Sequence, residues 1–303
     1  MNTPDPAMPF TGERFTPECV REIWYEHWHR YVFARALARG RRVLDAACGE
    51  GYGSALLADV AASVVGIDIA PQAIAHAQSR YGSRANLRFQ LGDCTALDVP
   101  AASFDVVASF ETLEHVAAQD RLIAGFARAL TAEGILVVSS PDKRTYSDVS
   151  GFRNAFHVRE LYRDELLALL RPHFPHVRLY GQKLLFQSAI WALDAPPQRV
   201  DAATTTGAER AAQPGLAYDP LYFIAVCSRQ PLPDLADLAV FGDREESVYQ
   251  HYNAEVRHNM AAGARMAELE AEVAALHRSS REAPAGPSQS TRPWWRRWLR
   301  PRD

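Results

Sequence analysis

The sequence predicts an α/β fold in which a mostly parallel sheet is covered by helices on both faces. Short apolar runs alternate with segments of helical periodicity along residues 41–143, and this alternation is typical of a parallel sheet. Runs such as VVGI, VVASF and ILVVS are apolar without interruption, as expected for strands buried on both faces. A glycine-rich turn, GEGYG, joins the first strand to the helix that follows it.

The elements follow one another in a regular order. Five strands are expected in the first half of the chain, at 42–47, 63–70, 85–93, 104–110 and 134–141. Helices are expected at 25–37, 54–62, 71–82, 117–130 and 157–174, and Pro71 is well placed for a helix start. Two further strands are expected at 176–182 and 221–229.

The second half of the chain is less regular. Residues 182–220 are rich in Ala, Thr, Gln and Pro, and so long a loop is usually functional or disordered, so we interpret it as an insertion over the acceptor. A linker is expected at 231–260. A short coiled coil, or equally a solvated single helix, is expected at 261–278, where Met266, Leu269, Val273 and Leu276 have alternating three- and four-residue spacing. Residues 279–303 are expected to form a flexible tail.

Composition excludes several classes of protein. The 303 residues carry a net charge of −3, which gives the body no footprint for nucleic acid. The four cysteines are scattered without a CxxC pair, so a zinc knuckle or a disulfide scaffold is not expected. The N-terminus lacks the apolar core of a signal peptide, and no run of about 18 apolar residues occurs. We therefore expect a cytoplasmic protein.

The glycine turn has an unusual charge for a nucleotide-binding loop. Asp45 and Glu50 flank it, no lysine or arginine does, and the Gly-Lys-Ser/Thr ending of a phosphate loop is absent. The spacing is GxGxG rather than the GxGxxG of dinucleotide sites. Because the two acids would repel a pyrophosphate, a ligand with a cationic amine or sulfonium is favoured.

Two more acids follow the next strands. Asp68 comes at the end of the second strand, where a carboxylate can accept hydrogen bonds from ribose hydroxyls. Asp93 follows the third strand, where it or its neighbouring backbone can recognise an adenine amino edge. The carboxyl ends of parallel strands are where open α/β sheets bind ligands.

Four segments in order, VLDAACGEGYG, GIDI, GDC and FDVVASFETLEHV, resemble the class I S-adenosylmethionine-dependent methyltransferases. The resemblance covers residues 41–143 most strongly. It implies a methyltransferase domain over 41–230 with a Rossmann-like seven-stranded sheet whose last strand is antiparallel. It also implies an enzyme that uses S-adenosylmethionine, with residues 1–40 as an N-terminal lid.

The resemblance also implies the cofactor residues. Asp45, Ala47, Gly49 and Gly51 would face the methionine end, Asp68 and Ile69 the ribose, Asp93 and Cys94 the adenine, and Phe110 the sulfonium. Arg30 or Arg14 is expected to pair with the methionine carboxylate, because guanidinium and carboxylate groups form bidentate pairs.

Catalytic candidates follow the fourth strand. In a helix Glu111, Glu114 and His115 would share one side, where they could bind a divalent cation such as Mg²⁺, or His115 could act as a base. The ubiquinone-biosynthesis O-methyltransferases carry a similar Glu-x-x-Glu-His run associated with a metal. The alternative is a Glu that caps the helix and a His that packs against the pocket. His157, in a loop after the fifth strand, is expected at the acceptor.

Three further segments, FTGERFTPE, EHWHRY and NAFHVREL, resemble bacterial methyltransferases of surface-polysaccharide biosynthesis, although Ala155 stands where those proteins have proline. The resemblance implies O-methylation of a sugar hydroxyl on such a polysaccharide or its lipid-linked precursor. A quinone or secondary-metabolite O- or N-methyltransferase, and a non-catalytic scaffold that binds S-adenosylmethionine, remain open.

The chain ends on an aromatic and basic segment, WWRRWLRPR. On a helix its tryptophans and Leu299 would lie opposite its arginines, an arrangement that suits an anionic membrane surface. We therefore expect residues 293–300 to contact the inner face of the membrane.

Overall fold

The computed structural model describes residues 22–190, 193–194, 200–206 and 211–282. Its strands are β1 (Arg42–Ala46), β2 (Ser63–Asp68), β3 (Leu87–Leu91), β4 (Phe104–Ser109), β5 (Leu130–Pro141), β6 (His176–Gln182), β7 (Ala203–Thr206), β8 (Ala211–Pro214) and β9 (Tyr222–Ser228). Its α-helices are α1 (Glu22–Ala38), α2 (Tyr52–Ala58), α3 (Pro71–Tyr81), α4 (Gln119–Ala129), α5 (Arg163–Leu170) and α6 (Ser247–Glu282).

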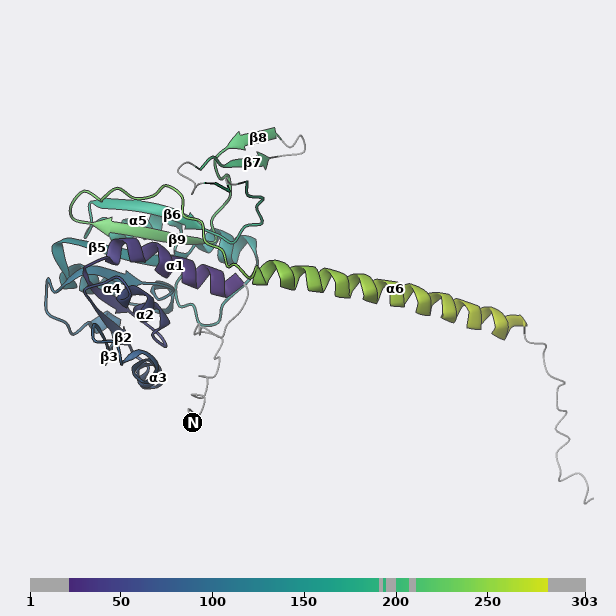
Figure 1. Ribbon diagram of the computed structural model, residues 1–303, viewed down its shortest axis with the longest axis horizontal. Helices are drawn as coiled ribbons and strands as arrows, with labels where there is room; N and C mark the ends of the chain where they lie inside the picture. Colours follow the sequence, from purple (N-terminus) through teal and green to yellow (C-terminus); the bar gives the residue numbers. More distant parts are fainter. Residues whose placement is uncertain (1–21, 191–192, 195–199, 207–210, 283–303) are drawn as a thin grey trace, which may run out of the picture. The chain divides into compact units, whose positions relative to one another are not determined.

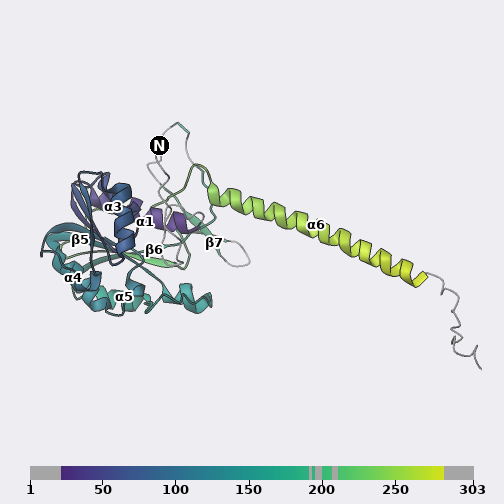
Figure 2. The ribbon, with the colours of Figure 1, turned by 90° about the horizontal axis from the view of Figure 1, so that it is seen from below.

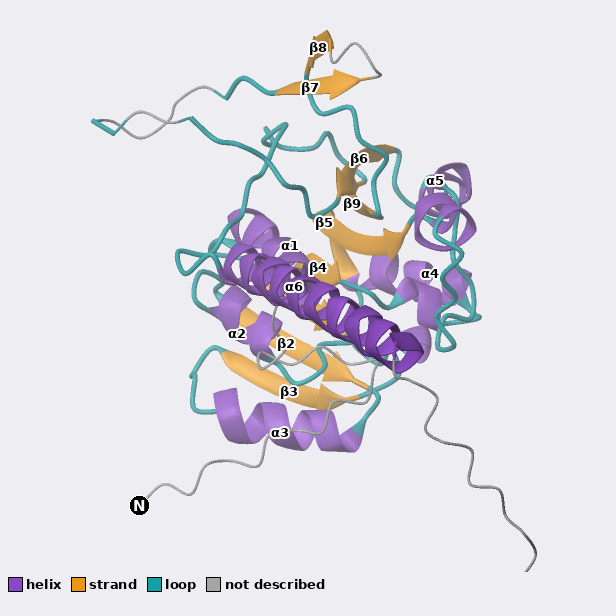
Figure 3. Ribbon diagram, turned by 90° about the vertical axis from the view of Figure 1, so that its right-hand side faces the viewer, coloured by secondary structure: helices purple, strands orange, loops and turns teal. Residues whose placement is uncertain are grey.

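Seven of the strands form one sheet in the order β3-β2-β1-β4-β5-β9-β6, which Figure 3 shows from β3 at the bottom to β6 at the top. The pairs are parallel except around β9, which runs antiparallel to both β5 and β6. This topology confirms the predicted seven-stranded, mostly parallel sheet with an antiparallel last strand.

Helices cover both faces of this sheet. The helices α1, α2 and α3 pack on one face and α4 and α5 on the other, in two separate apolar clusters (Figures 1 and 2). The central strands are buried along almost their whole length, as their uninterrupted apolar runs predict. Burial on both faces fixes the strand ends, and these ends position the polar side chains of the ligand edge.

The ligand edge is the border where the parallel strands end. Here β1 and β2 lead into the glycine turn and Asp68, and β4 leads into Glu111. At the same edge Tyr222, the first residue of β9, pairs with Pro141 of β5 on one side and Gln182 of β6 on the other. Residues that are far apart in the chain therefore lie together along the ligand edge.

Helix α5 begins six residues later than the sequence predicts. Leu161 forms an isolated parallel bridge with Asp142, which keeps the chain extended up to Tyr162. Glu165 then accepts a hydrogen bond from the backbone of Tyr162 at 2.9 Å, the reciprocal cap that starts a helix. Residues 157–162 thus stay in a loop over the ligand edge.

Part of the segment that we expected as a linker, 231–260, packs on the domain that precedes it. Leu232 and Leu235 pack against the apolar cluster under α1, and Phe241 stacks on His29 with ring centroids 5.6 Å apart. These contacts hold the segment in place because they remove apolar surface from water. Helix α6 then begins at Ser247, well before the predicted start of the coiled coil at residue 261. The long insertion contains a second unpredicted feature, the β7–β8 hairpin.

Two predicted segments lie wholly or partly outside the described residues. The membrane-contact segment 293–300 and the part of the N-terminal lid before residue 22, with Arg14, are not described. The described part of that lid is α1, whose Tyr31 and Ala34 are buried in the core. Among the described residues, no helix combines the length and hydrophobicity that crossing a bilayer requires.

Candidate active site

The glycine turn after β1 is a series of left-handed residues. Ala47, Gly49 and Gly51 have φ angles of 60°, 57° and 93°, a region that non-glycine residues rarely adopt. A Cβ on Gly51 would lie 2.7 Å from Cβ of Ala77 and 2.8 Å from the ring of Phe89. The turn therefore needs glycine at residue 51 for space as well as for conformation.

The acid at the end of β2 braces this turn. Asp68 is 6% exposed and accepts hydrogen bonds of 2.9 Å from the backbone N–H groups of Gly49 and Ala70. Carboxylate oxygens can each accept more than one hydrogen bond. A contact between Asp68 and a ribose is compatible with this bracing and stays a prediction.

The acid within β1 is enclosed by the protein. Asp45 is fully buried and accepts hydrogen bonds from Tyr31 Oη at 3.1 Å and Ser54 Oγ at 2.6 Å. Burial raises the pKa of Asp45 from 3.8 to about 6, against the lowering effect of the two hydroxyls. Asp45 thus ties α1 and α2 to the sheet, and its predicted contact with the methionine end stays a prediction.

The predicted adenine end lies beside a cavity. Asp93 accepts hydrogen bonds of 2.8 Å from N and Oγ1 of Thr95 and so caps a short 3-10 turn, while burial raises the pKa of the Cys94 thiol to about 12. A cavity of about 420 Å³ opens at the ends of β2 and β3 and is lined by Asp93 and Leu97. The neighbouring Ile69 is 68% exposed, so it offers an apolar surface.

Arg30 is a buried cation with an incomplete set of partners. Its side chain is fully buried, its Nε donates to Oε1 of Gln182 at 2.8 Å, and its guanidinium lies 4.4 Å from the ring centre of Tyr222. Its Nη1 is 3.4 Å from Oε1 of Glu111. Neither Nη1 nor Nη2 makes a hydrogen bond with any residue in the described part of the chain.

Arg30 remains charged in this position. Burial lowers its pKa, but the carboxylate of Glu111 is the largest of several groups that raise it, and the net direction is upward. Its charge also interacts with Tyr52, the first residue of α2 after the glycine turn. Glu111 balances the charge of Arg30, but the hydrogen-bond donors of Nη1 and Nη2 have no acceptor among the described residues, so this position favours a further anionic partner.

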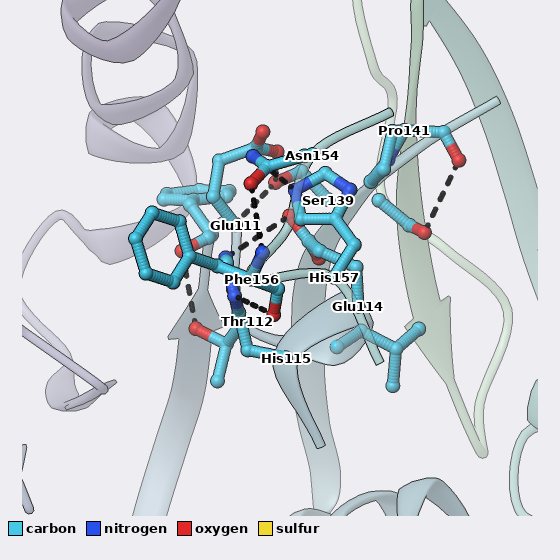
Figure 4. Close-up of polar contacts among 12 residues, drawn as sticks. Glu111, Thr112, Glu114, His115, Ser139, Pro141, Asn154, Phe156 and His157 are labelled. Carbon is cyan, nitrogen blue, oxygen red and sulfur yellow. Dashed lines mark hydrogen bonds and ion pairs between the residues drawn. The ribbon is translucent and has the colours of Figure 1, made fainter. Parts of the chain in front are cut away.

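Glu111 corrects a prediction about the catalytic segment. Its φ angle is 49°, and the turn that follows spans only Leu113–His115. Glu111, Glu114 and His115 therefore do not share one side of a helix. Instead Ser139 Oγ donates to Glu111 Oε1 at 2.8 Å and accepts from its backbone N–H at 2.9 Å (Figure 4). This ring of bonds holds Glu111 toward Arg30.

A second cluster contains Glu114, His115 and His157, whose ligand atoms lie within 4.8 Å of one another. Glu114 is fully buried, and neither of its carboxyl oxygens makes a hydrogen bond with the described residues. Burial, followed by the charge of Glu111, raises its pKa well above the usual range. The rings of His115 and His157 meet edge to face, with centroids 5.0 Å apart (Figure 4).

Hydrogen bonds assign the tautomers of the two histidines. The carbonyl oxygen of Phe156 lies 3.1 Å from Nδ1 of His115 and can only accept, so Nδ1 carries the proton. This tautomer leaves the lone pair of His115 Nε2 available. The side chain of His115 is 27% exposed, and its Nε2 lies 4.0 Å from Oε1 of the buried Glu114.

His157 uses both of its ring nitrogens within the protein. Asn154 Oδ1 accepts from the backbone N–H of Phe156 at 3.0 Å, so its Nδ2 faces His157 Nε2 at 3.0 Å as a donor. The other nitrogen, Nδ1, donates to Glu160 at 2.6 Å. His157 thus lies beside Glu114 and His115 and holds the 154–160 loop, and its predicted role at the acceptor stays a prediction.

This donor set does not fit a metal centre well. The structure does not bring Glu111 into the cluster, and the lone pair of His157 Nε2 is occupied by Asn154. Mg²⁺ takes oxygen ligands and keeps several waters, whereas the one carboxyl of the cluster, on Glu114, is fully buried. Binding of Mg²⁺ by Glu111, Glu114 and His115 stays a prediction.

A larger cavity of about 810 Å³ lies on the β6 side of the ligand edge. Its walls include Tyr25 of α1, Asp142 after β5, Arg163 at the start of α5, Gln182 of β6 and Phe241. Sequence reasoning missed Gln182, Tyr222 and Glu160. The position of a polar residue at the end of a predicted strand could have indicated Gln182, but no local motif marks the other two.

Comparison with known proteins agrees with this geometry. Residues 44–138 match the family model described as "Methyltransferase domain". A Mycolicibacterium smegmatis protein named as a probable S-adenosylmethionine-dependent methyltransferase is 40% identical over 167 residues, which cover 54% of this chain and 64% of that one. The comparisons thus show that residues 44–138 are similar to a methyltransferase domain. The name of the Mycolicibacterium smegmatis relative ties that protein to S-adenosylmethionine.

Other relatives and one solved structure extend the comparison. A similarly named Mycobacterium tuberculosis protein is 40% identical over 173 residues, covering 56% of this chain and 62% of that one. A ubiquinone biosynthesis O-methyltransferase of Azorhizobium caulinodans is 32% identical over 130 residues, covering 42% and 51%. The chain thus spans less than two thirds of these relatives.

A chain from the complex of the Haloferax volcanii Trm112 methyltransferase activator with a methyltransferase has the same fold. The TM-score is 0.50 at 19% identity, with 68% of this chain and 91% of that one covered.

Proposed function

We propose that the protein transfers the methyl group of S-adenosylmethionine to a hydroxyl group of an acceptor bound at the ligand edge. The observation that carries the proposal is the buried guanidinium of Arg30, whose terminal nitrogens make no hydrogen bond with the described residues. It lies near both Tyr52, which follows the glycine turn, and Glu111 after β4. A carboxylate is the anion that a guanidinium binds best in a bidentate manner.

The residues present fit the cofactor at two points. Arg30 would hold the methionine carboxylate, and the cavity lined by Asp93 and Leu97 offers space for the adenine. When bound, S-adenosylmethionine supplies a methyl group on a sulfonium sulfur, which retains the electron pair of the broken carbon–sulfur bond. Phe110, 7% exposed and edge-on to Tyr31, keeps water from this part of the edge.

The chemistry left to the protein is alignment and proton removal. His115 presents the lone pair of Nε2 and takes the proton of the acceptor hydroxyl as the new oxygen–carbon bond forms. The Asn154–His157–Glu160 bonds hold the loop whose Phe156 carbonyl fixes that tautomer. Glu111, bound to Ser139, acts by orienting Arg30.

The acceptor we favour is a sugar hydroxyl of a surface polysaccharide or its lipid-linked precursor. Its support is the resemblance of the sequence segments and a cavity of about 810 Å³ that combines rings such as Tyr25 and Phe241 with polar groups such as Asp142 and Arg163. Sugars are bound by this combination of ring faces and hydrogen-bonding groups. The ubiquinone-biosynthesis relatives support the alternative of a quinone or other small-molecule acceptor. The non-catalytic scaffold is the third reading.

Cofactor binding tests the first step. We expect Arg30→Met, which keeps side-chain volume and removes the charge, to weaken S-adenosylmethionine binding about 100-fold in calorimetry, because charge-assisted hydrogen bonds contribute roughly 1.5–3 kcal/mol each. Arg35→Ala is the control, since Arg35 lies on the same helix and its side chain is 36% exposed. Equal affinity in Arg30→Met and the native protein would contradict the proposed anchor.

Turnover tests the second step. The protein is incubated with S-adenosylmethionine carrying a labelled methyl group and, separately, with lipid-linked oligosaccharides or quinone precursors. Label in the oligosaccharide supports the sugar acceptor, and label in the quinone precursor supports the alternative. Cofactor binding without methyl transfer to any acceptor would favour the scaffold.

A further inference from the structure

Helix α6 carries an apolar stripe that this chain leaves exposed. Every residue from 254 to 278 is exposed, and Met266, Leu269 and Val273 are 62%, 43% and 49% exposed. Large apolar side chains repeated along one side of a solvated helix mark a surface that binds another helix. The stripe lies on α6, which belongs to a second compact unit that starts at residue 246.

The stripe follows a heptad frame. Counting from Met266 as position a, the a positions are Asn259, Met266 and Val273, and the d positions are Ala262, Leu269 and Leu276. A β-branched residue at a with leucine at d favours two strands in a parallel coiled coil. An asparagine at a single a position fixes the register and number of the strands, because each asparagine pairs with its copy. Asn259 occupies such a position.

The charges that flank the stripe are complementary to a second copy. Arg265 and Glu272 occupy g positions, and Glu270 and His277 occupy the e positions five residues after them. In a parallel, in-register pair each g residue faces the e residue of the next heptad of the other helix. Arg265 then faces Glu270 of the other copy, and Glu272 faces His277.

We propose that residues 259–277 of α6 pair with the same segment of a second copy as a parallel, in-register, two-stranded coiled coil. This extends the self-association expected at 261–278 by fixing the number of chains, their orientation and their register. Because the two α6 helices start at the same end of such a coil, the two methyltransferase domains that precede them would be joined at that end. A protein with two joined active sites suits an acceptor with repeated groups.

The mass of the full chain in solution tests the number of strands. Sedimentation equilibrium at micromolar concentration is expected to give twice the chain mass. Leu269→Glu combined with Val273→Glu places charges in the seam and is expected to give the chain mass. Ala267→Glu combined with Ala271→Glu adds the same charges at outer positions b and f and should keep the double mass. A native monomer or trimer, or a seam variant with unchanged mass, overturns the proposal.

Cross-linking tests orientation and register. In a parallel, in-register pair the d positions face each other, so Ala262→Cys should form a disulfide between chains under mild oxidation. Ala264→Cys, at the outer position f, should not. Cys48, Cys94 and Cys227 are buried, and the native chain, which also carries Cys19, provides the background for both variants. Cross-linking that is equal in the two variants, or absent from Ala262→Cys, contradicts the parallel register.

Exchange of charges tests the g–e pairing. Arg265→Glu and Glu270→Arg each place like charges opposite each other in a pair of identical chains. Mixed together, the two variants restore opposite charges at both positions, so the mixed pair should form at least about threefold more tightly than either identical pair. Differently tagged chains and capture of one tag measure the mixed fraction. A random mixture of the two variants would contradict the pairing.

Discussion

The two halves of the ligand edge differ in how their polar groups are satisfied. On the side of β1, β2 and β3, each acid already has donors from the protein: Asp45 from Tyr31 and Ser54, Asp68 from Gly49 and Ala70, and Asp93 from Thr95. On the side of β5, β9 and β6, two fully buried groups lack hydrogen-bond partners among the described residues. The terminal nitrogens of Arg30 and the carboxyl oxygens of Glu114 make no hydrogen bonds with the described residues.

We interpret the half formed by β1, β2 and β3 as structural support and the other half as the part that carries the chemistry. Asp68 holds the glycine turn, Asp45 ties two helices to the sheet and Asp93 caps a 3-10 turn, so bonds within the protein organise this half. The missing hydrogen bonds of Arg30 and Glu114 have a free-energy cost, since a buried polar atom without a hydrogen-bond partner destabilises a fold. Substitutions in the first half should therefore lower stability, and substitutions in the second half should lower activity.

The largest effect is expected for the base. His115→Gln removes the Nε2 lone pair, and general bases contribute about 10²–10⁴-fold to rates, so kcat should fall by that factor with little change in melting temperature. Formation of S-adenosylhomocysteine in the presence of the acceptor measures it.

Variants of two other histidines provide the comparison for the kcat of His115→Gln. His176→Ala is the matched control, because His176 is exposed at the other end of β6. His157→Gln should reduce kcat less than His115→Gln, since both nitrogens of His157 are bound within the loop. The assignment fails if His115→Gln retains native kcat or if His157→Gln is the more damaging of the two.

The next effect concerns stability in the first half. In Gly51→Ala the new Cβ would lie 2.7 Å from Cβ of Ala77 at a φ of 93°. Overpacking and a left-handed backbone should together lower the free energy of unfolding by about 3 kcal/mol in urea titration. Gly40→Ala is the control, because Gly40 has a φ of 68° with nothing within 4 Å of its Cβ, and its loss should be about 1 kcal/mol. Equal losses would show that the crowding at Gly51 is relieved.

The sequence predicts the first half well because its groups are close together in the chain. The strand, the turn and the acids up to Asp93 lie within about fifty residues, and apolar runs with glycine spacing determine their places. The seven strands were expected close to their observed positions. The central strands are buried on both faces and therefore have a distinctive composition.

The second half could not be predicted to the same depth, because it is assembled from distant segments. Arg30 of α1 meets Gln182 of β6 across 152 residues, and the antiparallel entry of β9 places Tyr222 between them and β5. Glu111 does not lie in a helix, because its backbone is left-handed and its N–H group donates to Ser139 of β5. The docking of Phe241 on α1 likewise depends on a surface that exists only after folding.

A third prediction uses the pH dependence of stability. The pKa of Asp45 is raised from 3.8 to about 6 by burial, so the folded state binds this proton more tightly than the unfolded state. The stabilisation is fully present below about pH 4 and is lost as the pH rises through about 6, by about 3 kcal/mol in order of magnitude. Asp45→Asn removes this loss, so the variant should gain stability relative to the native protein as the pH rises.

A carboxylate with the opposite shift provides the control. The hydrogen bond from Arg42 lowers the pKa of Asp105, so its contribution is present at neutral pH and lost as the pH falls. Asp105→Asn should therefore lose stability relative to the native protein at neutral pH. Urea titrations at several pH values measure both differences. Parallel curves for native protein and Asp45→Asn would contradict the raised pKa.

The smallest expected effect is that of metal removal. Dialysis against a chelator should leave kcat unchanged, because Asn154 occupies His157 Nε2, Ser139 and Arg30 engage Glu111, and Glu114 is fully buried. Activity lost on chelation and restored by Mg²⁺ would instead support the centre of Glu111, Glu114 and His115. Glu111 would then have to release Arg30, so Mg²⁺ would also change the affinity for S-adenosylmethionine, and calorimetry with and without Mg²⁺ would detect that coupling.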